Sequence, residues 1–435
     1  MKIFFGWWIV AGSVLARSLS GGLNAYGVSA FFLPLAEEFG TGRAALSGAI
    51  SLSRLEAGLI GPVEGYLVDR FGPRKLMFAG IFLMGLGFIL MSQINSLALF
   101  YVVYIVGITL GSSIGIGFPT QVAVANWFRR KRGIAMGIAG SGVGLGGVIV
   151  PFLAWAIANF GWRSAAIVVG LIIWAFGFPI ATLMRHRPEA YGYLPDGDVA
   201  PRQTSPTAEA HSNHAEIRSA NTVADEEESF TVMEAMRTKA FWLISIGFSL
   251  RLMVTSAVVI HQIPFLIGMG IAPEVAGAIL GSLGVVSIAG RFGFAFLADR
   301  MEPRYLTALC CALLAAGMFI LMNSTTTWHL ILYIAVYAPG YGGLTSLMPI
   351  MKANYFGPKS FGQVLGISGL VQMVGTVSGP FLAGLVYDLT GSYQIAFFTF
   401  AIAGLLAMII FLVSRRPTKR STPALDTPVL SQTPS

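Results

Sequence analysis

Long apolar stretches recur along almost the whole chain, and they restrict its fold more than any other feature of the sequence. A helix needs about 20 apolar residues to cross a bilayer. The 435-residue chain is 55% hydrophobic and only 11% charged, whereas soluble domains are about 25% charged. The sequence therefore predicts an all-α membrane protein. Twelve stretches are long enough, at about 6–34, 44–68, 75–93, 97–121, 132–158, 163–184, 240–268, 275–298, 304–322, 328–350, 360–387 and 393–413.

Positive charges gather on one side of these stretches. The loops after the second, fourth and eighth stretches read "DRFGPRK", "FRRKR" and "DRMEPR", while alternate loops such as "SQINS" and "STTTW" carry no Lys or Arg. Because Lys and Arg accumulate on the cytoplasmic side, both termini are predicted to be cytoplasmic. Basic residues spaced in this way form no continuous basic face, so the net charge of +8 does not indicate a nucleic-acid partner.

The chain also divides into two halves that repeat each other. "DRFGPR" at 69–74 returns as "DRMEPR" 230 residues later, and "PFLA" at 151–154 returns 229 residues later. Matches in one order and at nearly one offset indicate internal duplication. Between the halves lies a polar, acidic segment that is typical of a disordered linker. We predict an N-terminal six-helix bundle at 1–185, a cytoplasmic linker at 186–238, a C-terminal six-helix bundle at 239–414 and a disordered cytoplasmic tail at 415–435.

The loop after the second stretch resembles the signature of the major facilitator superfamily. The run "GYLVDRFGPRK" at 65–75 has the pattern Gly-x-x-x-Asp-Arg-x-Gly followed by basic residues. The resemblance implies two six-helix bundles that transport a solute by alternating access. It also implies a cytoplasmic gate, in which Asp69 would face the positive end of the helix that begins near residue 360. The predicted gate residues are Asp69, Arg70, Arg74, Asp299 and Arg300.

A narrower resemblance is to the bacterial monocarboxylate-porter and oxalate/formate-antiporter branch. It rests on "FFGWW" near the start, "YGVSAFFLPLAEEFG" after it, "ANWFRRKRGIAMGIAGSG" at 125–142 and Arg291 in the eighth stretch. The resemblance implies that Arg291 binds the carboxylate of the substrate. The chain departs from the branch at two points. Ser287 stands where animal monocarboxylate carriers have an acid, and the eleventh stretch lacks the lysine of oxalate exchangers.

Arg291 is exceptional on physical grounds as well. It lies nine residues before Arg300, which places it about 14 Å from the end of its helix and therefore near the middle of a membrane about 30 Å thick. The equivalent position in the first half is Gly61, so this arginine is not part of the duplicated scaffold. A guanidinium group offers paired donors to one carboxylate. A structural ion pair with Glu56 or another acid is the alternative.

Other charged residues at membrane depth are functional candidates by default. The roles of Arg17, Arg54 and Arg251 stay open, with an ion pair between Arg17 and Glu56 as one interpretation. Glu56 and His261 are the candidates for proton coupling, since His titrates near neutral pH. Polar residues of the central helices are expected to line the substrate site with Arg291, namely Asn24, Tyr26, Tyr104, Tyr337, Tyr341 and Gln372.

Together these features predict a secondary active transporter in the cell membrane rather than an enzyme. The predicted substrate is a small organic anion, a monocarboxylate before any other, carried with a proton. Exchange of oxalate/formate type, multidrug efflux and a transporter-like sensor are the alternatives. The two adjacent cysteines, Cys310 and Cys311, indicate helix packing rather than a metal site. No cofactor is expected, the partners are the anion, a proton or counter-anion and the lipid bilayer, and the protein is expected to be a monomer.

Overall fold

The computed structural model describes residues 4–128, 131–186, 188–191, 194, 196, 230–298, 300–357 and 361–417. Regular structure in these residues is helical throughout, and they contain no strand. Nine stretches among them are long and apolar enough to cross a membrane. The first two of the twelve predicted spans are not among these nine, so the count of twelve stays a prediction.

The first half of the chain forms a group of helices with several irregular segments. Its first predicted span is interrupted by a π-helical segment. The elements are α1 (Phe5–Ser20), η1 (Gly21–Ala25), α2 (Val28–Phe39), α3 (Arg43–Phe71), α4 (Pro73–Met91), α5 (Leu97–Val102), η2 (Val103–Thr109), α6 (Leu110–Ser112), η3 (Ser113–Gly117), α7 (Phe118–Trp127), α8 (Arg132–Leu145), η4 (Gly146–Ile149) and α9 (Val150–Leu183).

One of the nine stretches, Gly133–Leu183, is 51 residues long, far more than one crossing needs. It bends at Gly161, where φ is +79°. A side chain at this position would strain the backbone, so glycine allows the chain to turn sharply. The fifth and sixth predicted spans are therefore joined at this bend.

The second half is more regular. After the short η5 (Glu189–Tyr191), its elements are α11 (Val232–Met236), α12 (Lys239–Gly268), α13 (Pro273–Ala298), α14 (Pro303–Met322), α15 (Thr327–Phe356), α16 (Phe361–Thr390) and α17 (Gln394–Val413). Cys310 and Cys311 in α14 are free thiols with no exposed surface.

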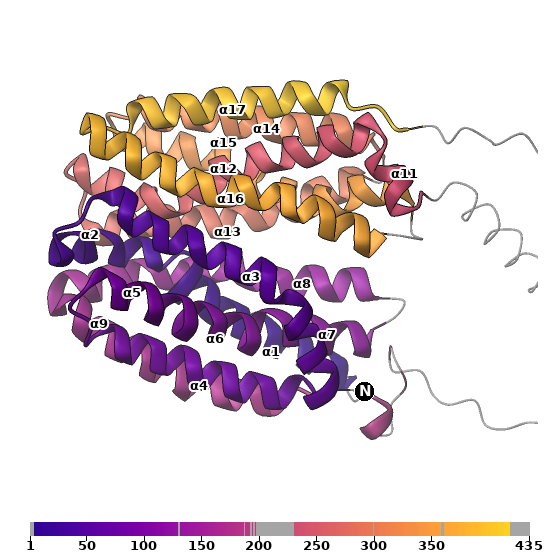
Figure 1. Ribbon diagram of the computed structural model, residues 1–435, viewed down its shortest axis with the longest axis horizontal. Coiled ribbons are helices and arrows are strands. Elements are labelled where there is room, and N and C mark those ends of the chain that lie inside the picture. Colours follow the sequence, from indigo (N-terminus) through magenta and orange to yellow (C-terminus); the bar gives the residue numbers. More distant parts are fainter. Residues whose placement is uncertain are drawn as a thin grey trace, which may run out of the picture.

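The two halves lie side by side, with the N-terminus and the end of α17 at the same end of the molecule (Figure 1). Helices α1–α9 form one group and α12–α17 form the other. Contacts between the groups come mainly from α3 with α16 and from α8 and α9 with α13. These contacts place the candidate site between the halves.

The last residues of the predicted linker are ordered against the second half. Residues 197–229 lie outside the described residues, but Phe230 is buried and its N–H donates to the carbonyl of Phe356 at 2.9 Å. Thr231 then caps α11 in a reciprocal capping box with Glu234. The prediction of disorder is therefore wrong for the last residues of the linker, because an aromatic anchor and a helix cap fix them to the second half.

Candidate functional site

Arg291 reaches from the second half of the chain to the first. It projects from α13, and its Nη1 donates to the carbonyl of Gly140 in α8 at 3.0 Å. Its Nε is buried without a hydrogen-bond partner among the described residues. The side chain is half-buried, so part of its donor capacity faces the space between the halves.

Two further arginines lie near it. Arg17 of α1 donates from Nε to Thr120 Oγ1 at 3.0 Å and from Nη2 to the carbonyl of Gly117 at 3.1 Å. Arg251 of α12 is 5% exposed, and its Nη2 donates to the carbonyl of Tyr341 at 3.3 Å. Both guanidinium groups lie within electrostatic reach of Arg291. Three cations from three helices thus converge, and we call them the arginine cluster.

The arginine cluster has no acidic partner in the described part of the molecule. The ion pairs found there join Arg163 to Glu38 and Arg304 to Glu302. The side chain of Glu56 is outside the described residues, so its predicted pairing with Arg17 stays a prediction. Buried like charges without a counterion are strongly unfavourable. The arrangement therefore favours an anionic ligand.

Tyrosines line the arginine cluster. The rings of Tyr337 and Tyr341 stack with centroids 6.4 Å apart, and the guanidinium of Arg251 lies 5.7 Å from the Tyr341 ring. Tyr26 of the first half lies near Tyr341 and Arg291, but its hydroxyl makes no hydrogen bond of normal geometry to a described residue. The Tyr337 hydroxyl and the Arg251 Nε are equally unpaired and buried. Several unused donors thus surround the cations.

The other predicted lining residues lie elsewhere. Tyr104 and Asn24 meet in the core of the first half, with the Tyr104 hydroxyl 3.5 Å from Asn24 Oδ1, and they border a void of only about 10 Å³. Arg54 is half-buried and lies near Tyr104. Gln372 of α16 donates to Ser368 Oγ at 3.1 Å. None of these contacts joins the arginine cluster.

Lys352 is a buried cation that the sequence analysis missed. The tenth stretch was predicted to end at residue 350, with Lys352 in the following loop, but α15 continues to Phe356. The ammonium group donates to Ser368 Oγ, and the side chain is 1% exposed. The aromatic pair Tyr355 and Phe356 could have indicated that the helix continues past Lys352, because both side chains are buried.

At the end away from the termini, α3 and α16 are fastened to each other. Both oxygens of Asp388, near the end of α16, accept backbone N–H groups, those of Arg43 and Ala44, at 2.8 Å each. These residues begin α3, whose free N–H groups and positive dipole favour a carboxylate. The Arg43 guanidinium lies 3.5 Å from the Tyr387 ring centroid and donates to the Tyr393 hydroxyl at 2.7 Å. We call these contacts the outer latch.

His261 belongs to the same closed end. Its Nδ1 is 2.9 Å from the Tyr393 hydroxyl, and its Nε2 is 2.9 Å from the Pro380 carbonyl and 3.0 Å from Ser47 Oγ. Burial raises the pKa of Tyr393, although the Arg43 guanidinium opposes the shift, so this hydroxyl keeps its proton and can donate it to Nδ1. The partners therefore fit a neutral ring protonated at Nε2. His261 bridges the halves here, away from the arginine cluster.

Glycines bring α13 against α8 and η4 at this end. A Cβ added at Gly144 would lie 2.6 Å from the carbonyl oxygen of Gly284, and Gly147 and Gly281 approach each other even more closely. Toward the end with the termini the glycines are uncovered instead. A Cβ at Gly133 or Gly366 would meet no atom within 4 Å. The halves are thus in close backbone contact through α13, α8 and η4, whereas a side chain at Gly133 or Gly366 would touch no described atom of the other half.

The predicted gate lies at that uncovered end. The side chains of Asp69 and Asp299 are outside the described residues. Arg70 and Arg74 are exposed, and Arg70 Nη1 donates to the Tyr66 hydroxyl at 2.9 Å. Arg300 is exposed and lies over the Phe296 ring at 4.5 Å. Arg70 and Arg300 therefore contact aromatic residues four positions before them in the sequence.

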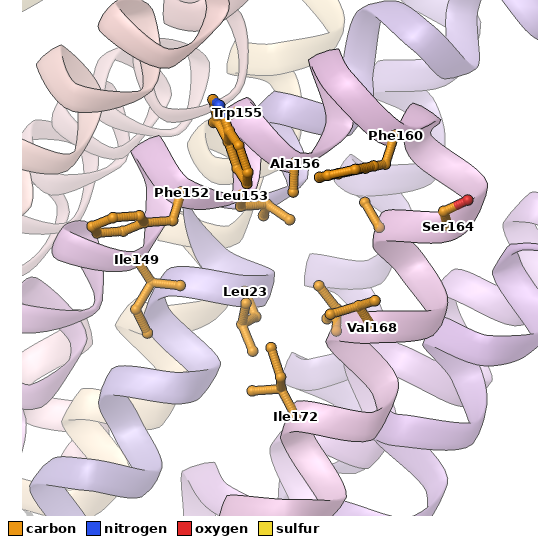
Figure 2. Close-up of a pocket in the computed structure, with 12 residues that line it drawn as sticks. Leu23, Ile149, Phe152, Leu153, Trp155, Ala156, Phe160, Ser164, Val168 and Ile172 are labelled. Atoms are coloured by element: carbon orange, nitrogen blue, oxygen red, sulfur yellow. The ribbon is translucent and has the colours of Figure 1, made fainter.

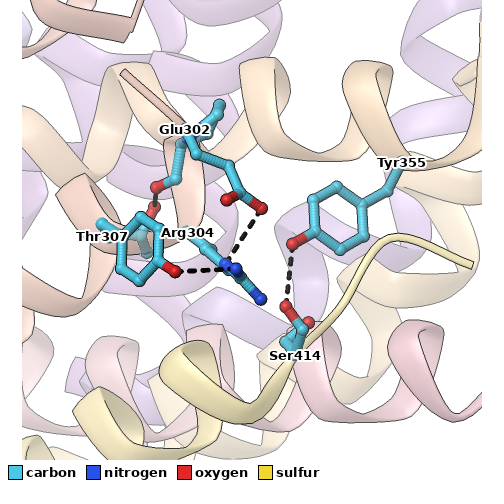
Figure 3. Close-up of polar contacts among 7 residues, drawn as sticks. Glu302, Arg304, Thr307, Tyr355 and Ser414 are labelled. Carbon is cyan, nitrogen blue, oxygen red and sulfur yellow. Dashed lines mark hydrogen bonds and ion pairs between the residues drawn. The ribbon is translucent and has the colours of Figure 1, made fainter.

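Figure 3 shows how the second copy of the signature loop is held. Arg304 Nε lies 2.9 Å from Glu302 Oε1. The Tyr355 hydroxyl donates to the carbonyl of Ser414 at 2.8 Å, which ties α15 to the end of α17. Both contacts stay within the second half. They stabilise that half without crossing to the first.

A separate apolar groove lies on the first half (Figure 2). Its volume is about 540 Å³, and Leu23, Phe152, Phe160, Val168 and Ile172 are among its lining residues. Phe152 and Phe160 are 68% and 63% exposed. None of the predicted substrate residues lines it, so this groove is distinct from the arginine cluster.

Curated proteins similar to this chain include several named monocarboxylate transporters. Monocarboxylate transporter 12 of Mus musculus is 25% identical over 451 residues, covering 97% of this chain and 90% of that protein. Monocarboxylate transporter 12-B of Danio rerio is 25% identical, covering 91% and 83%. Monocarboxylate transporter 2 of Homo sapiens is 24% identical, covering 89% and 81%.

Solved structures and a family profile agree on the fold. A bacterial homolog of the human lysosomal transporter Spinster, in its inward-facing and occupied conformation, matches with a TM-score of 0.68 at 14% identity, covering 95% of this chain and 96% of that one. The xylose transporter XylE from E. coli matches with a TM-score of 0.66, also at 14% identity, covering 94% and 99%. The Major Facilitator Superfamily profile matches residues 14–349 and 269–431. The chain is therefore a multi-pass membrane transporter that belongs to the major facilitator superfamily.

Proposed function

We propose that this protein carries a small organic anion, a monocarboxylate, across the cell membrane by alternating access and together with a proton. The arginine cluster is the observation that carries the proposal. Arg17, Arg251 and Arg291 come together without an acidic partner in the described part of the chain. The names of the similar monocarboxylate transporters support the same substrate class.

The site suits a carboxylate in its chemistry. Arg251 and Arg291 each keep an unpaired Nε, and Tyr26 and Tyr337 keep unpaired hydroxyls, all buried. A carboxylate that accepts these donors would satisfy them and neutralise part of the positive charge. An apolar cation would meet three like charges instead. This contrast argues against efflux of cationic drugs.

The two ends of the molecule suit alternating access. The outer latch pairs an acid at the end of α16 with the start of α3. The predicted gate pairs Asp69, at the end of α3, with the start of α16. The two devices would join the same two helices, α3 and α16, at their opposite ends. With cytoplasmic termini, the outer latch is extracellular and this conformation faces inward, so transport requires the outer latch to break while the gate forms.

Uptake of labelled carboxylates into proteoliposomes, with and without an inward proton gradient, tests the proposal. Arg291→Ala should lower kcat/KM by about 30-fold or more, because losing one partner of a buried charge pair costs about 2–5 kcal/mol. Arg163→Ala, at an ion pair far from the arginine cluster with 38% exposed side chains, is the matched control. Normal uptake by the Arg291 variant, or preferential transport of cationic dyes by the unaltered protein, would contradict the proposal.

A further inference from the structure

Glu64 is a buried acid that neither the sequence analysis nor the proposed site uses. It lies in α3, its side chain is 2% exposed, and its Oε1 has no hydrogen-bond partner among the described residues. Among the described residues that are buried, it is the single carboxylic acid. Such a group is costly in its charged form and binds a proton readily if one can reach it.

Ser113 is the one described polar group that acts on the Glu64 carboxyl. Ser113 opens η3, and the segment from there to the end of α7 contains no charged residue. The other ionisable residues of α3 are Arg43, Arg54, Glu56, Tyr66, Asp69 and Arg70, of which the side chains of Glu56 and Asp69 lie outside the described residues. The other ionisable groups on elements that pack against α3 lie toward the ends of the helices or in η2: Glu37, Glu38, Arg74, Lys75, Tyr101, Tyr104, Tyr387 and Asp388.

Segment η3 links this acid to the arginine cluster. Arg17 donates to the carbonyl of Gly117, the last residue of η3, and to Thr120 Oγ1 in the α7 helix that follows. Ser113 and Gly117 are one turn apart, about 6 Å along the axis. The segment is π-helical, and such irregular turns occur frequently at functional sites. Glu64 and Arg17 therefore lie near the two ends of one irregular turn.

We propose that Glu64 carries the proton that accompanies the anion, an inference that rests on the proposed function. When the arginine cluster is empty, its positive field favours the ionised carboxylate across a medium of low dielectric constant. When a carboxylate binds, it cancels part of that field, and burial then favours the neutral acid. One proton binds to a Glu64 oxygen as one anion binds, and the same proton leaves after the anion is released. For a monocarboxylate the cycle moves no net charge.

Glu64→Gln separates this role from substrate binding, because glutamine keeps the shape of the side chain but cannot lose a proton. In proteoliposomes, accumulation of labelled carboxylate driven by a proton gradient should fall by about tenfold or more. Exchange of the same carboxylate without a gradient should stay within about twofold of the unaltered protein. Glu274→Gln, an exposed acid at the start of α13, is the matched control.

Retained accumulation by Glu64→Gln would overturn the inference while leaving the proposed function intact. If the unaltered protein neither accumulates nor exchanges carboxylates, the proposed function itself fails. A second measurement needs no variant. A hydrophobic carbodiimide reacts with protonated buried carboxyl groups, so mass spectrometry should find its modification of Glu64 increasing several-fold as the pH falls and as carboxylate is added. Modification that is independent of both would also overturn the inference.

Discussion

At the scale of single residues, the candidate site is defined by buried hydrogen-bond donors that have no acceptor among the described residues. Native proteins satisfy nearly all buried polar groups, yet Tyr26, Tyr337, Arg251 and Arg291 each keep a buried donor without a partner among the described residues. These groups are explained if they bind a ligand. Each unpaired donor would then raise the affinity for the ligand and lower the stability of the ligand-free protein.

Tyr337→Phe tests this opposition. Without the hydroxyl, KM for the carboxylate should rise by about tenfold, since hydrogen bonds to charged groups contribute about 1.5–3 kcal/mol. The ligand-free protein should unfold at a higher temperature, because a buried unpaired hydroxyl is removed. Tyr333→Phe is the control: its hydroxyl donates to Gln262 Oε1 at 3.1 Å, so we expect a lower unfolding temperature and an unchanged KM. A shared response of both variants would show that Tyr337 is structural.

The sequence was enough to single out Arg291 as a candidate substrate residue, because a cation stands out in an apolar run. It did not predict that Arg17 and Arg251 lie beside it, because convergence of three helices depends on their rotation and packing. Lys352 was missed for a different reason. A span boundary set by hydropathy alone ended the helix six residues before its last residue, Phe356, so a buried ammonium group appeared to lie in a loop.

At the scale of elements, helix ends and glycines decide which faces of the two halves can meet. The outer latch depends on the start of α3, where two N–H groups lack intrahelical partners and Asp388 supplies the acceptors. It was not predicted, because the pairing joins residues more than 340 positions apart. The corresponding gate at the other end, with Asp69 facing the start of α16, was implied by the family resemblance and stays a prediction.

Asp388→Asn should loosen the outer latch. A neutral amide interacts less well with the helix dipole and offers one acceptor oxygen instead of two, a loss of about 1 kcal/mol. Hydrogen–deuterium exchange of the Arg43 and Ala44 amides should accelerate about fivefold. Glu38→Gln, which alters an ion pair within the first half, should leave their exchange unchanged. If the Asp388 variant exchanges no faster, the carboxylate does not hold the two helices together.

Gly281→Ala should prevent closure of the same end. The added Cβ would clash with the backbone of Gly147, and backbone cannot move aside as a flexible side chain can. Uptake should fall by about tenfold or more, and amides around Gly147 should exchange faster. Gly268→Ala is the control, since a Cβ there meets nothing within 4 Å. Equal uptake by the two variants would refute this account of the closed end.

At the scale of the whole molecule, hydropathy and duplication predicted the all-helical class and the arrangement in two groups of helices. The π-helical segments and the bend at Gly161 could not be predicted from hydropathy or from the duplication. The π-helical segments η1, η2 and η3 have no residue signature of their own, because they arise where packing displaces one backbone hydrogen bond. The bend at Gly161 was compatible with the sequence, but many of the 52 glycines were equally so.

The predicted orientation can be tested on the intact chain. The N-terminus and the end of α17 lie at one end of the molecule (Figure 1), and the distribution of Lys and Arg predicts that this end is cytoplasmic. In a bacterial host, green fluorescent protein fused to the C-terminus should fluoresce, while alkaline phosphatase fused at the same point should be inactive. The opposite pattern would invert the molecule and would make the outer latch cytoplasmic.

The two cysteines have a practical consequence. The chain contains only Cys310 and Cys311, and neither has exposed surface. A polar maleimide should therefore spare the folded native protein, so a single cysteine introduced at the surface becomes the one reactive position without removal of the native pair. Conversely, the slow rate at which the native pair is modified would measure how often α14 opens to solvent. The rate of that modification would therefore report local unfolding of the protein around Cys310 and Cys311.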